Sequence, residues 1–408
     1  MDGSGPTSVL GRDTHAVASN DEAPDLNEET SRLSRYGDWT SIQNFCQIPT
    51  STSSRTLYHG LAVHERMTAI REAITYIRTH WSDYSTFLEG LRAYLQKHGF
   101  VMVPTEHDKH TIDAVLTSQK EWIDRQPSTG ALTGETYDVI RLYTSSFGYA
   151  QIFAMLNTDF RMDVLTHDDN DLRPAVFLVE LLNIDLYNYV SAQPTANFQG
   201  IVYRGLSISP EQIQEFEDLA AKPPAERHWS IPLSMMSAST NVDVAVGFAL
   251  ADSKLGRNRH PFLWRIHVAE LDPELCQIYR RRFPSSVVSS LCAVRIAELS
   301  TYQEEEVLLR GPWFQLLRLQ HEEVGQLGVR MPVMDLVMLN SNRDHPSTME
   351  LGAVDDEARQ LFASLVGMAR SKVCADLATE YGLSDDAQQY NEMHKQQHKK
   401  VLDICNMP

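Results

Sequence analysis

The segment Ser300-Thr301-Tyr302-Gln303-Glu304-Glu305-Glu306-Val307-Leu308-Leu309 places three consecutive acids directly before an apolar, strand-forming tripeptide. If the acids continue the strand, their side chains alternate between its two faces, so Glu304 and Glu306 point the same way. Two carboxylates on one face repel each other and titrate as a coupled pair. Such a pair suits a site that stabilises a cation and accepts a proton, although an acidic run by itself usually only faces water.

The composition is that of an ordinary globular protein. Of the 408 residues, 42% are hydrophobic and 22% are charged, which is enough apolar side chain for a substantial core. The formal net charge of −18 argues against nucleic acid or an anionic membrane as the main partner. The sequence contains no run of 18 apolar residues, so we expect no membrane span.

The two ends and the cysteines indicate where the protein acts. The first residues lack the charged-then-apolar pattern of a signal peptide, and the last residues form no hydrophobic tail for a lipid anchor. The five cysteines are scattered and include no C-x-x-C pair, which is typical of reduced thiols. We therefore expect a cytoplasmic protein, with secretion by a route that needs no signal peptide left open.

The sequence divides into four segments, which together predict an α+β fold. Residues 1–56 are rich in small and polar residues, which predicts a mostly disordered tail. Residues 57–195 show helical periodicity and predict a helical subdomain. Residues 196–345 predict a β-rich core, and residues 346–408 predict a C-terminal helical extension. The clearest helical stripe consists of Phe87, Leu88, Leu91, Tyr94 and Leu95.

Local signals place the main elements of the β-rich segment. Ser209, Pro210 and Gln212 predict a capped helix start, and Asn241 is expected to cap a helix over 242–250. Alternating or continuous apolar runs predict strands over 199–205, 231–239, 261–268, 292–296, 306–309, 314–319 and 334–339.

Three separated pieces of this segment carry residues suited to one chemistry. Arg204 lies at a strand end, where its planar fork of donors can clamp a phosphate, and Gly205 lets a flat ligand approach the backbone. Ser237, in Ser-Ala-Ser, can hydrogen-bond a glutamate on a neighbouring strand. A carboxylate such as Glu306 that faces a ribose can stabilise an oxocarbenium-like transition state as a glycosidic bond breaks.

Together these pieces closely resemble the arginine-specific mono-ADP-ribosyltransferases of the R-S-E class, which include ecto-enzymes and bacterial toxins. The family pattern is an arginine on a first strand, S-T-S on a second and E-x-E just before a third. These positions are matched here by Arg204, by Ser237, and by Glu304 with Glu306. The likeness covers roughly 130 to 345.

Further positions agree with the family or depart from it. The helix after the serines, with Ala245 and Phe248, and the upstream stretch with Tyr143 and Thr144, also look like family motifs. Ala238 replaces the usual middle threonine of S-T-S. In addition, Met235 stands where an aromatic residue is usual, and the insert between Val268 and Cys292 looks long. These departures leave the principal positions intact.

The resemblance implies a fold, a substrate and an activity. It implies two packed sheets with an NAD-binding cleft between them, preceded by a helical subdomain and followed by extra helices. NAD, or NADP, is the implied substrate, with no metal ion. The implied reaction transfers ADP-ribose to an arginine of a protein, this chain itself included, and releases nicotinamide.

The resemblance also implies a role for each matched residue. Arg204 and Gly205 would bind the NAD phosphate and the nicotinamide carboxamide, Ser237 would orient Glu306, and Glu306 would stabilise the ribosyl cation. Glu304 would position the acceptor guanidinium and take its proton. Lesser implied roles are target recognition by Tyr302, NAD contact by Ser239 and stacking on nicotinamide by Phe248.

Each role has a simpler alternative, and two rival functions stay open. Arg204 could be a surface arginine paired with an acid, Gly205 a turn glycine and Ser237 a core-edge serine; Tyr302 and Phe248 could merely pack. An NAD glycohydrolase would use water as acceptor, and a catalytically silent NAD-binding protein would release no nicotinamide.

Two further groups of residues carry weaker signals. A basic loop of Lys254, Arg257 and Arg259 could help with phosphates, although a solvated loop is the simpler interpretation. His394 and His398 have helical spacing that could hold a metal ion, but no third ligand is in view.

Overall fold

The structure, a computed structural model, describes residues 72–73, 76–77, 80, 83–97, 137–144, 169–230, 235–251, 258–282, 292–300, 305–310, 313–340 and 356–405. Its described strands are β1 (Gly200–Ile208), β2 (His228–Ser230), β3 (Met235–Ser239), β4 (His260–Ala269), β5 (Ala293–Arg295), β6 (Glu306–Arg310), β7 (Trp313–Val324) and β8 (Val329–Leu339).

These strands form a single sheet of eight in the order β2-β7-β8-β4-β1-β3-β6-β5. All neighbours are antiparallel except β4 and β8. The expectation of two separate packed sheets is therefore wrong for the described residues. The sheet nevertheless comes close to dividing, because β1 pairs with β4 along its whole length but meets β3 only where Tyr203 lies opposite Ser239.

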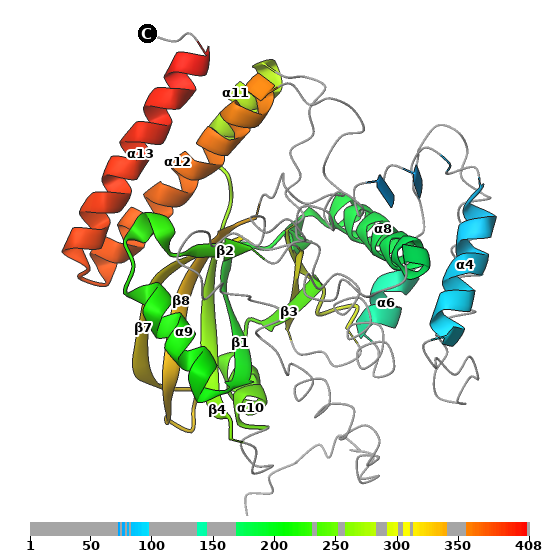
Figure 1. The fold of residues 1–408 in the computed structure, drawn as a ribbon, viewed down its shortest axis with the longest axis horizontal. Coiled ribbons are helices and arrows are strands. Elements are labelled where there is room, and N and C mark those ends of the chain that lie inside the picture. The colour runs from blue at the N-terminus through cyan, green and yellow to red at the C-terminus, as the bar shows by residue number, and fades with distance from the viewer. Residues whose placement is uncertain are drawn as a thin grey trace, which may run out of the picture.

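On one face of the sheet, the strands share an apolar core with three helices that precede β1 in the chain and one that follows it. These are α4 (Tyr84–Lys97), which packs on α8, then α6 (Asp138–Thr144), α8 (Asp169–Ala192) and α9 (Pro210–Ala220). Figure 1 shows α4, α6 and α8 grouped on one side of the molecule. The largest cluster of buried apolar residues lies here, with Trp264 packed edge-on against Phe216 of α9 and Phe314 of β7.

The other face of the sheet carries α10 (Val242–Ala251) and the helical pair α12 (Asp356–Glu380) and α13 (Ser384–Cys405). Figure 1 shows α12 and α13 side by side, with α11 (Pro273–Arg282) near the C-terminal end of α13. Helix α10 packs on Leu263 and Val333, whereas α12 and α13 pack on Leu317 and Val337. The helical extension predicted for the C-terminal segment is thus part of the packed body.

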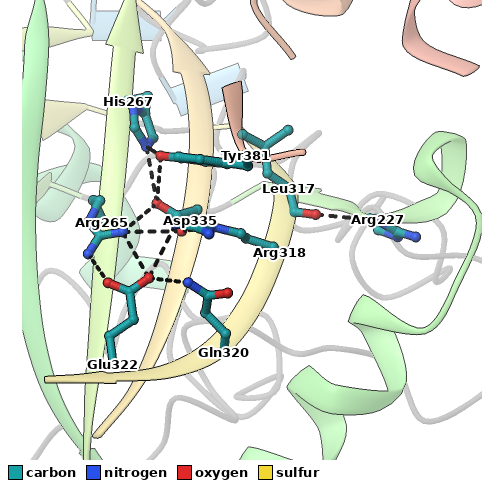
Figure 2. Close-up of polar contacts among 9 residues, drawn as sticks. All are labelled: Arg227, Arg265, His267, Leu317, Arg318, Gln320, Glu322, Asp335 and Tyr381. Carbon is teal, nitrogen blue, oxygen red and sulfur yellow. Dashed lines mark hydrogen bonds and ion pairs between the residues drawn. The ribbon is translucent and has the colours of Figure 1, made fainter. Parts of the chain in front are cut away.

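A polar network fastens this helical pair to the sheet (Figure 2). Asp335, which is fully buried, accepts hydrogen bonds from Arg318 Nε at 2.7 Å, Arg265 Nη1 at 3.2 Å and the Tyr381 hydroxyl at 3.3 Å. His267 Nε2 lies 3.2 Å from the same carboxylate. Glu322 joins through Arg265 at 2.5 Å. Because each charge has an opposite partner, the mutual attraction of these groups offsets part of the cost of removing them from water.

Burial and pairing shift the pKa of Asp335 in opposite directions. Burial alone would raise the pKa of Asp335, but the hydrogen bond with His267 and the charges of Arg265 and Arg318 hold that pKa below its ordinary value. Burial and the neighbouring Asp335 raise the pKa of Tyr381 to about 12. Asp335 is therefore favoured in its ionised form, and its negative charge compensates the positive charges of the arginines around it.

Most elements that local signals predicted are present. Ser209 and Gln212 form the predicted capping box, and the Asn241 side chain accepts a hydrogen bond from Asp243 N at 2.9 Å at the start of α10. Among the described α-helices and strands, β2 and α11 were not predicted from the sequence. Residues 98–136 and 145–168 of the predicted helical subdomain, residues 231–234 of a predicted strand and the predicted tail 1–56 lie outside the described residues. Within the part of the chain that is described, no helix is both long and apolar enough to cross a membrane.

Candidate active site

The gap between β1 and β3 is bridged by Arg204. Beyond the Tyr203–Ser239 pair the two strands no longer hydrogen-bond to each other, and the buried guanidinium of Arg204 donates from Nη1 to the Ser237 carbonyl. Arg204 therefore joins the first two of the three predicted segments. Contact of its remaining donors with an NAD phosphate stays a prediction.

The pairing of β3 with β6 places the third segment, which carries Glu306, next to the second segment, which carries Ser237 and Ser239. Ser239 lies opposite Glu306, and Ser237 lies opposite Leu308. Directly paired residues of antiparallel strands present their side chains on the same face, and residues two apart along a strand share that face. Ser237, Ser239 and Glu306 therefore face the same side. The principal arginine, serine and glutamate thus lie on three neighbouring strands, β1, β3 and β6. The pairing of Tyr203 with Ser239 places Arg204 on the opposite face of the sheet from Ser239 and Glu306, and the Arg204 side chain reaches β3 through the Ser237 carbonyl.

The hydroxyl that contacts Glu306 is not the one that the sequence suggested. Ser300 Oγ donates to Glu306 Oε2 at 2.7 Å, and both side chains are buried, with 5% and 3% of their surface exposed. The buried Ser237 Oγ has no hydrogen-bond partner among the described residues. Ser239 Oγ instead accepts from Asn241 N at 3.0 Å. Sequence reasoning overlooked Ser300, since a serine in an acidic loop carries no signal that marks it as a carboxylate partner.

The middle acid of the E-x-E motif adopts an unusual backbone conformation. Glu305 has φ +45°, in the left-handed region that non-glycine residues rarely occupy, and β6 begins only at Glu306. Strand alternation consequently does not extend back through the acids, and the argument that used it to place Glu304 and Glu306 on one face does not apply. Thr240 holds Glu305, with its Oγ1 donating to Oε2 at 2.6 Å. Glu304 and Tyr302 lie outside the described residues.

Gly205 has a packing role that the sequence did not reveal. A Cβ at this position would lie 1.7 Å from the Ala245 carbonyl oxygen and 2.8 Å from Ala249 N, both on α10. Only a residue without a side chain lets α10 pack this closely on β1. Phe248 on the same helix is half-buried. The predicted contacts of Gly205 and Phe248 with nicotinamide stay predictions.

The weaker candidates lie elsewhere. Arg259 donates to the Ser207 carbonyl at 3.0 Å, which ties its loop to β1, whereas Lys254 and Arg257 lie outside the described residues. His394 Nδ1 lies 3.0 Å from the Met368 carbonyl oxygen, and its ring stacks on that of His398. Among the described residues, no group of three or more His, Cys, Asp or Glu side chains could hold a metal ion.

Comparisons with known proteins give a loose likeness. No protein-family model matches the chain, and a search of curated proteins finds no match. Among solved structures, the ADP-ribosyltransferase Vis in complex with agmatine is 11% identical, with a TM-score of 0.32, over 62% of this chain and 92% of that one.

Two further solved structures give similar values. Plx2a, an ADP-ribosyltransferase toxin from Paenibacillus larvae, is 15% identical, with a TM-score of 0.28, over 56% of this chain and 94% of its own. An ADP-ribosyltransferase from Clostridium botulinum is 12% identical, with a TM-score of 0.29, over 59% of this chain and 99% of its own. These values do not establish a family, so the assignment below is argued from the residues of this chain.

Proposed function

We propose that this protein transfers ADP-ribose from NAD to an arginine side chain of a protein and releases nicotinamide. The observation that carries the proposal is the meeting of three distant segments: Arg204 donates to the backbone of Ser237, and Glu306 lies in the ladder of the same strand. This adjacency supports a single site built from the three motif segments.

The proposed chemistry needs a carboxylate beside the nicotinamide ribose. The bond from ribose C1′ to the nicotinamide nitrogen breaks, and its electron pair leaves with nicotinamide. The resulting cation on the ribose is stabilised by the Glu306 carboxylate, a preorganised charge in a buried setting. A guanidinium nitrogen of the acceptor then bonds to C1′, and its proton passes to Glu304.

The remaining residues bind and orient the NAD molecule. We assign Arg204 to the phosphate, Gly205 and Phe248 to the nicotinamide, Ser237 and Ser239 to the edge of the same pocket, and Tyr302 to the target. NAD is the only cosubstrate in this scheme, and no metal ion takes part. The acceptor is a protein with an exposed arginine.

The test is incubation of the full chain with NAD and agmatine, a small guanidine that replaces the protein acceptor. Chromatography follows free nicotinamide, and mass spectrometry follows ADP-ribosyl-agmatine. We expect both products in equal amounts above the no-enzyme control. Nicotinamide with free ADP-ribose alone would instead identify an NAD glycohydrolase. NAD binding without nicotinamide release would identify a silent binding protein, and either result overturns the proposed transfer.

A further inference from the structure

We infer that Ser300 is a positioning residue for the Glu306 carboxylate, and that helix α6 holds in place the turn that carries Ser300. This inference rests on the proposed function, because it concerns how the same site keeps its glutamate in one orientation. By this inference, α6 of the helical subdomain helps to fix the orientation of the Glu306 carboxylate.

The first step is the attachment of the turn 296–300 to Glu306. Ile296 N donates to the Glu306 carbonyl at 2.8 Å, while Ser300 Oγ donates to the Glu306 carboxylate at 2.7 Å. The turn itself is closed by Ser300 N, which donates to the Ile296 carbonyl at 2.9 Å. Both the main chain and the side chain of Glu306 are therefore held by one short turn.

The character of the Ser300 contact suits a positioning role. Hydroxyl-to-carboxylate hydrogen bonds are short and about twice as strong as neutral ones, and burial strengthens them further. A carboxylate that must face a ribose loses catalytic power when its rotamer is free, because small displacements of a reacting group cost large factors in rate. The Ser300 hydroxyl supplies such a restraint, whereas within the described part of the chain Ser237 Oγ contacts no hydrogen-bond partner.

The second step connects the turn to α6. Thr144, fully buried at the last position of α6, donates its hydroxyl proton to the Ile140 carbonyl at 3.0 Å, and the same Oγ1 lies 3.4 Å from the Leu299 carbonyl, next to Ser300. The neighbouring Tyr143 hydroxyl donates to the Met235 carbonyl, at the start of β3, at 3.1 Å. The C-terminal end of α6 therefore contacts both the turn that holds Glu306 and the strand that pairs with it.

The opposite end of α6 is fixed to α8. Asp185 Oδ2 accepts from Val139 N at 2.8 Å and from Ile140 N at 3.4 Å. These are first-turn amides of α6, which lack partners within their own helix, and a carboxylate there is favoured by the helix dipole. Both ends of α6 are thus held by contacts with other segments. We therefore expect a substitution of Thr144 to displace the turn 296–300 and, through that turn, the Glu306 carboxylate.

The experiment compares Ser300→Ala with a matched buried serine. Ser371 is equally enclosed, and its hydroxyl donates only to the Gly367 carbonyl in α12, so Ser371→Ala removes a similar hydrogen bond far from the site. We expect Ser300→Ala to lower kcat for nicotinamide release about 10- to 100-fold, the range for loss of a hydrogen bond to a charged group, with KM for NAD within about twofold. Ser371→Ala should retain wild-type kcat.

A second pair tests the helix. Thr144→Val removes a hydroxyl that bonds to the Ile140 carbonyl within α6 and also reaches Leu299, whereas Thr379→Val removes a hydroxyl that makes the matching bond to the Ala375 carbonyl within α12. We expect Thr144→Val to lower kcat about threefold to tenfold at unchanged KM, since it acts on Glu306 through the turn. Thr379→Val should have no effect on kcat.

The outcomes separate this inference from the proposed function. A wild-type chain that releases no nicotinamide overturns the proposed function itself. An active wild type in which Ser300→Ala matches Ser371→Ala overturns only the positioning role. A loss confined to KM, or a loss of kcat that tracks a lowered melting temperature equally in both serine variants, also counts against it.

Discussion

Glu306 lies directly opposite Ser239 in the ladder between β3 and β6, and Glu305, immediately before β6, has a left-handed backbone conformation. The strand thus begins at the glutamate that we place beside the ribose. The main chain of Glu306 is held by backbone hydrogen bonds to the neighbouring strand, and its carboxylate is held by the Ser300 hydroxyl. A backbone strained at the neighbouring residue is typical of a functional turn, because packing must hold it in place.

Replacement of Glu306 by glutamine should nearly abolish nicotinamide release. The substitution keeps the size of the side chain but removes the charge that stabilises the ribosyl cation, which typically costs on the order of 100- to 1000-fold in kcat. NAD binding, measured by titration calorimetry, should persist. Glu323→Gln, an exposed position on β7, is the matched control and should behave as wild type. An unchanged rate in Glu306→Gln would rule out the assignment.

Replacement of Glu304 by glutamine should separate transfer from hydrolysis. We assign Glu304 to the acceptor guanidinium and not to the cation, so the variant should lose ADP-ribosyl-agmatine while retaining part of its NAD hydrolysis. Both products are measured in one reaction by mass spectrometry and chromatography. Equal loss of the two would contradict the separate roles of the two acids.

Replacement of Gly205 by alanine should destabilise the fold. The new methyl group would overlap the Ala245 carbonyl, and such overpacking costs about 1–3 kcal/mol of unfolding free energy or more. Gly247→Ala is the control, since it lies in α10 with open space around its Cα and alanine favours a helix. Thermal unfolding should show a lowered Tm for Gly205→Ala and an equal or higher Tm for Gly247→Ala. Equal Tm values for both variants would show that α10 can move away from β1 at no cost.

Replacement of Asp335 by asparagine should weaken the attachment of α12 and α13 to the sheet. The change removes the buried anion between Arg265 and Arg318, which keep the half-buried Glu322 as a partner, and breaking a buried pair costs up to about 3–5 kcal/mol. Asp376→Asn, which removes an exposed ion pair with Lys372, should cost less than about 1 kcal/mol. Urea unfolding at pH 7 measures both. Similar midpoints for the two variants would mean that the network contributes no net stability.

The same carboxylate predicts how stability depends on pH. The pKa of Asp335 in the folded protein lies below its unfolded value of about 3.9, so its contribution is fully present above that pH. The contribution disappears as the pH falls from about 4 through the lowered folded pKa. Unfolding free energy measured between pH 7 and pH 3 should therefore decline less steeply at the acid end in Asp335→Asn than in wild type. Parallel curves would contradict this account.

Some features of this protein were set locally and could be predicted from sequence. The capping box of Ser209 and Gln212 starts α9 because the side chains that satisfy its free amides are three residues apart. The apolar stripe with Leu88 and Leu91 likewise falls within α4. By contrast, α11 is short and mostly polar, and β2 is a three-residue edge strand that exists only because β7 pairs with it. Neither carries enough periodicity to be visible on its own.

The sequence by itself determined which residues are available for the chemistry: an arginine, a serine pair and an E-x-E motif. The structure places Arg204 in the middle of β1 rather than at the strand end that the sequence predicted, and both serines within β3. The tertiary structure decided how they meet. It joined the strands into one sheet, placed Arg204 across the gap between β1 and β3, and gave Glu306 the hydroxyl of Ser300. The reason is physical: strand partners and hydrogen-bond donors come from segments far apart in the chain, and their pairing depends on how the whole core packs.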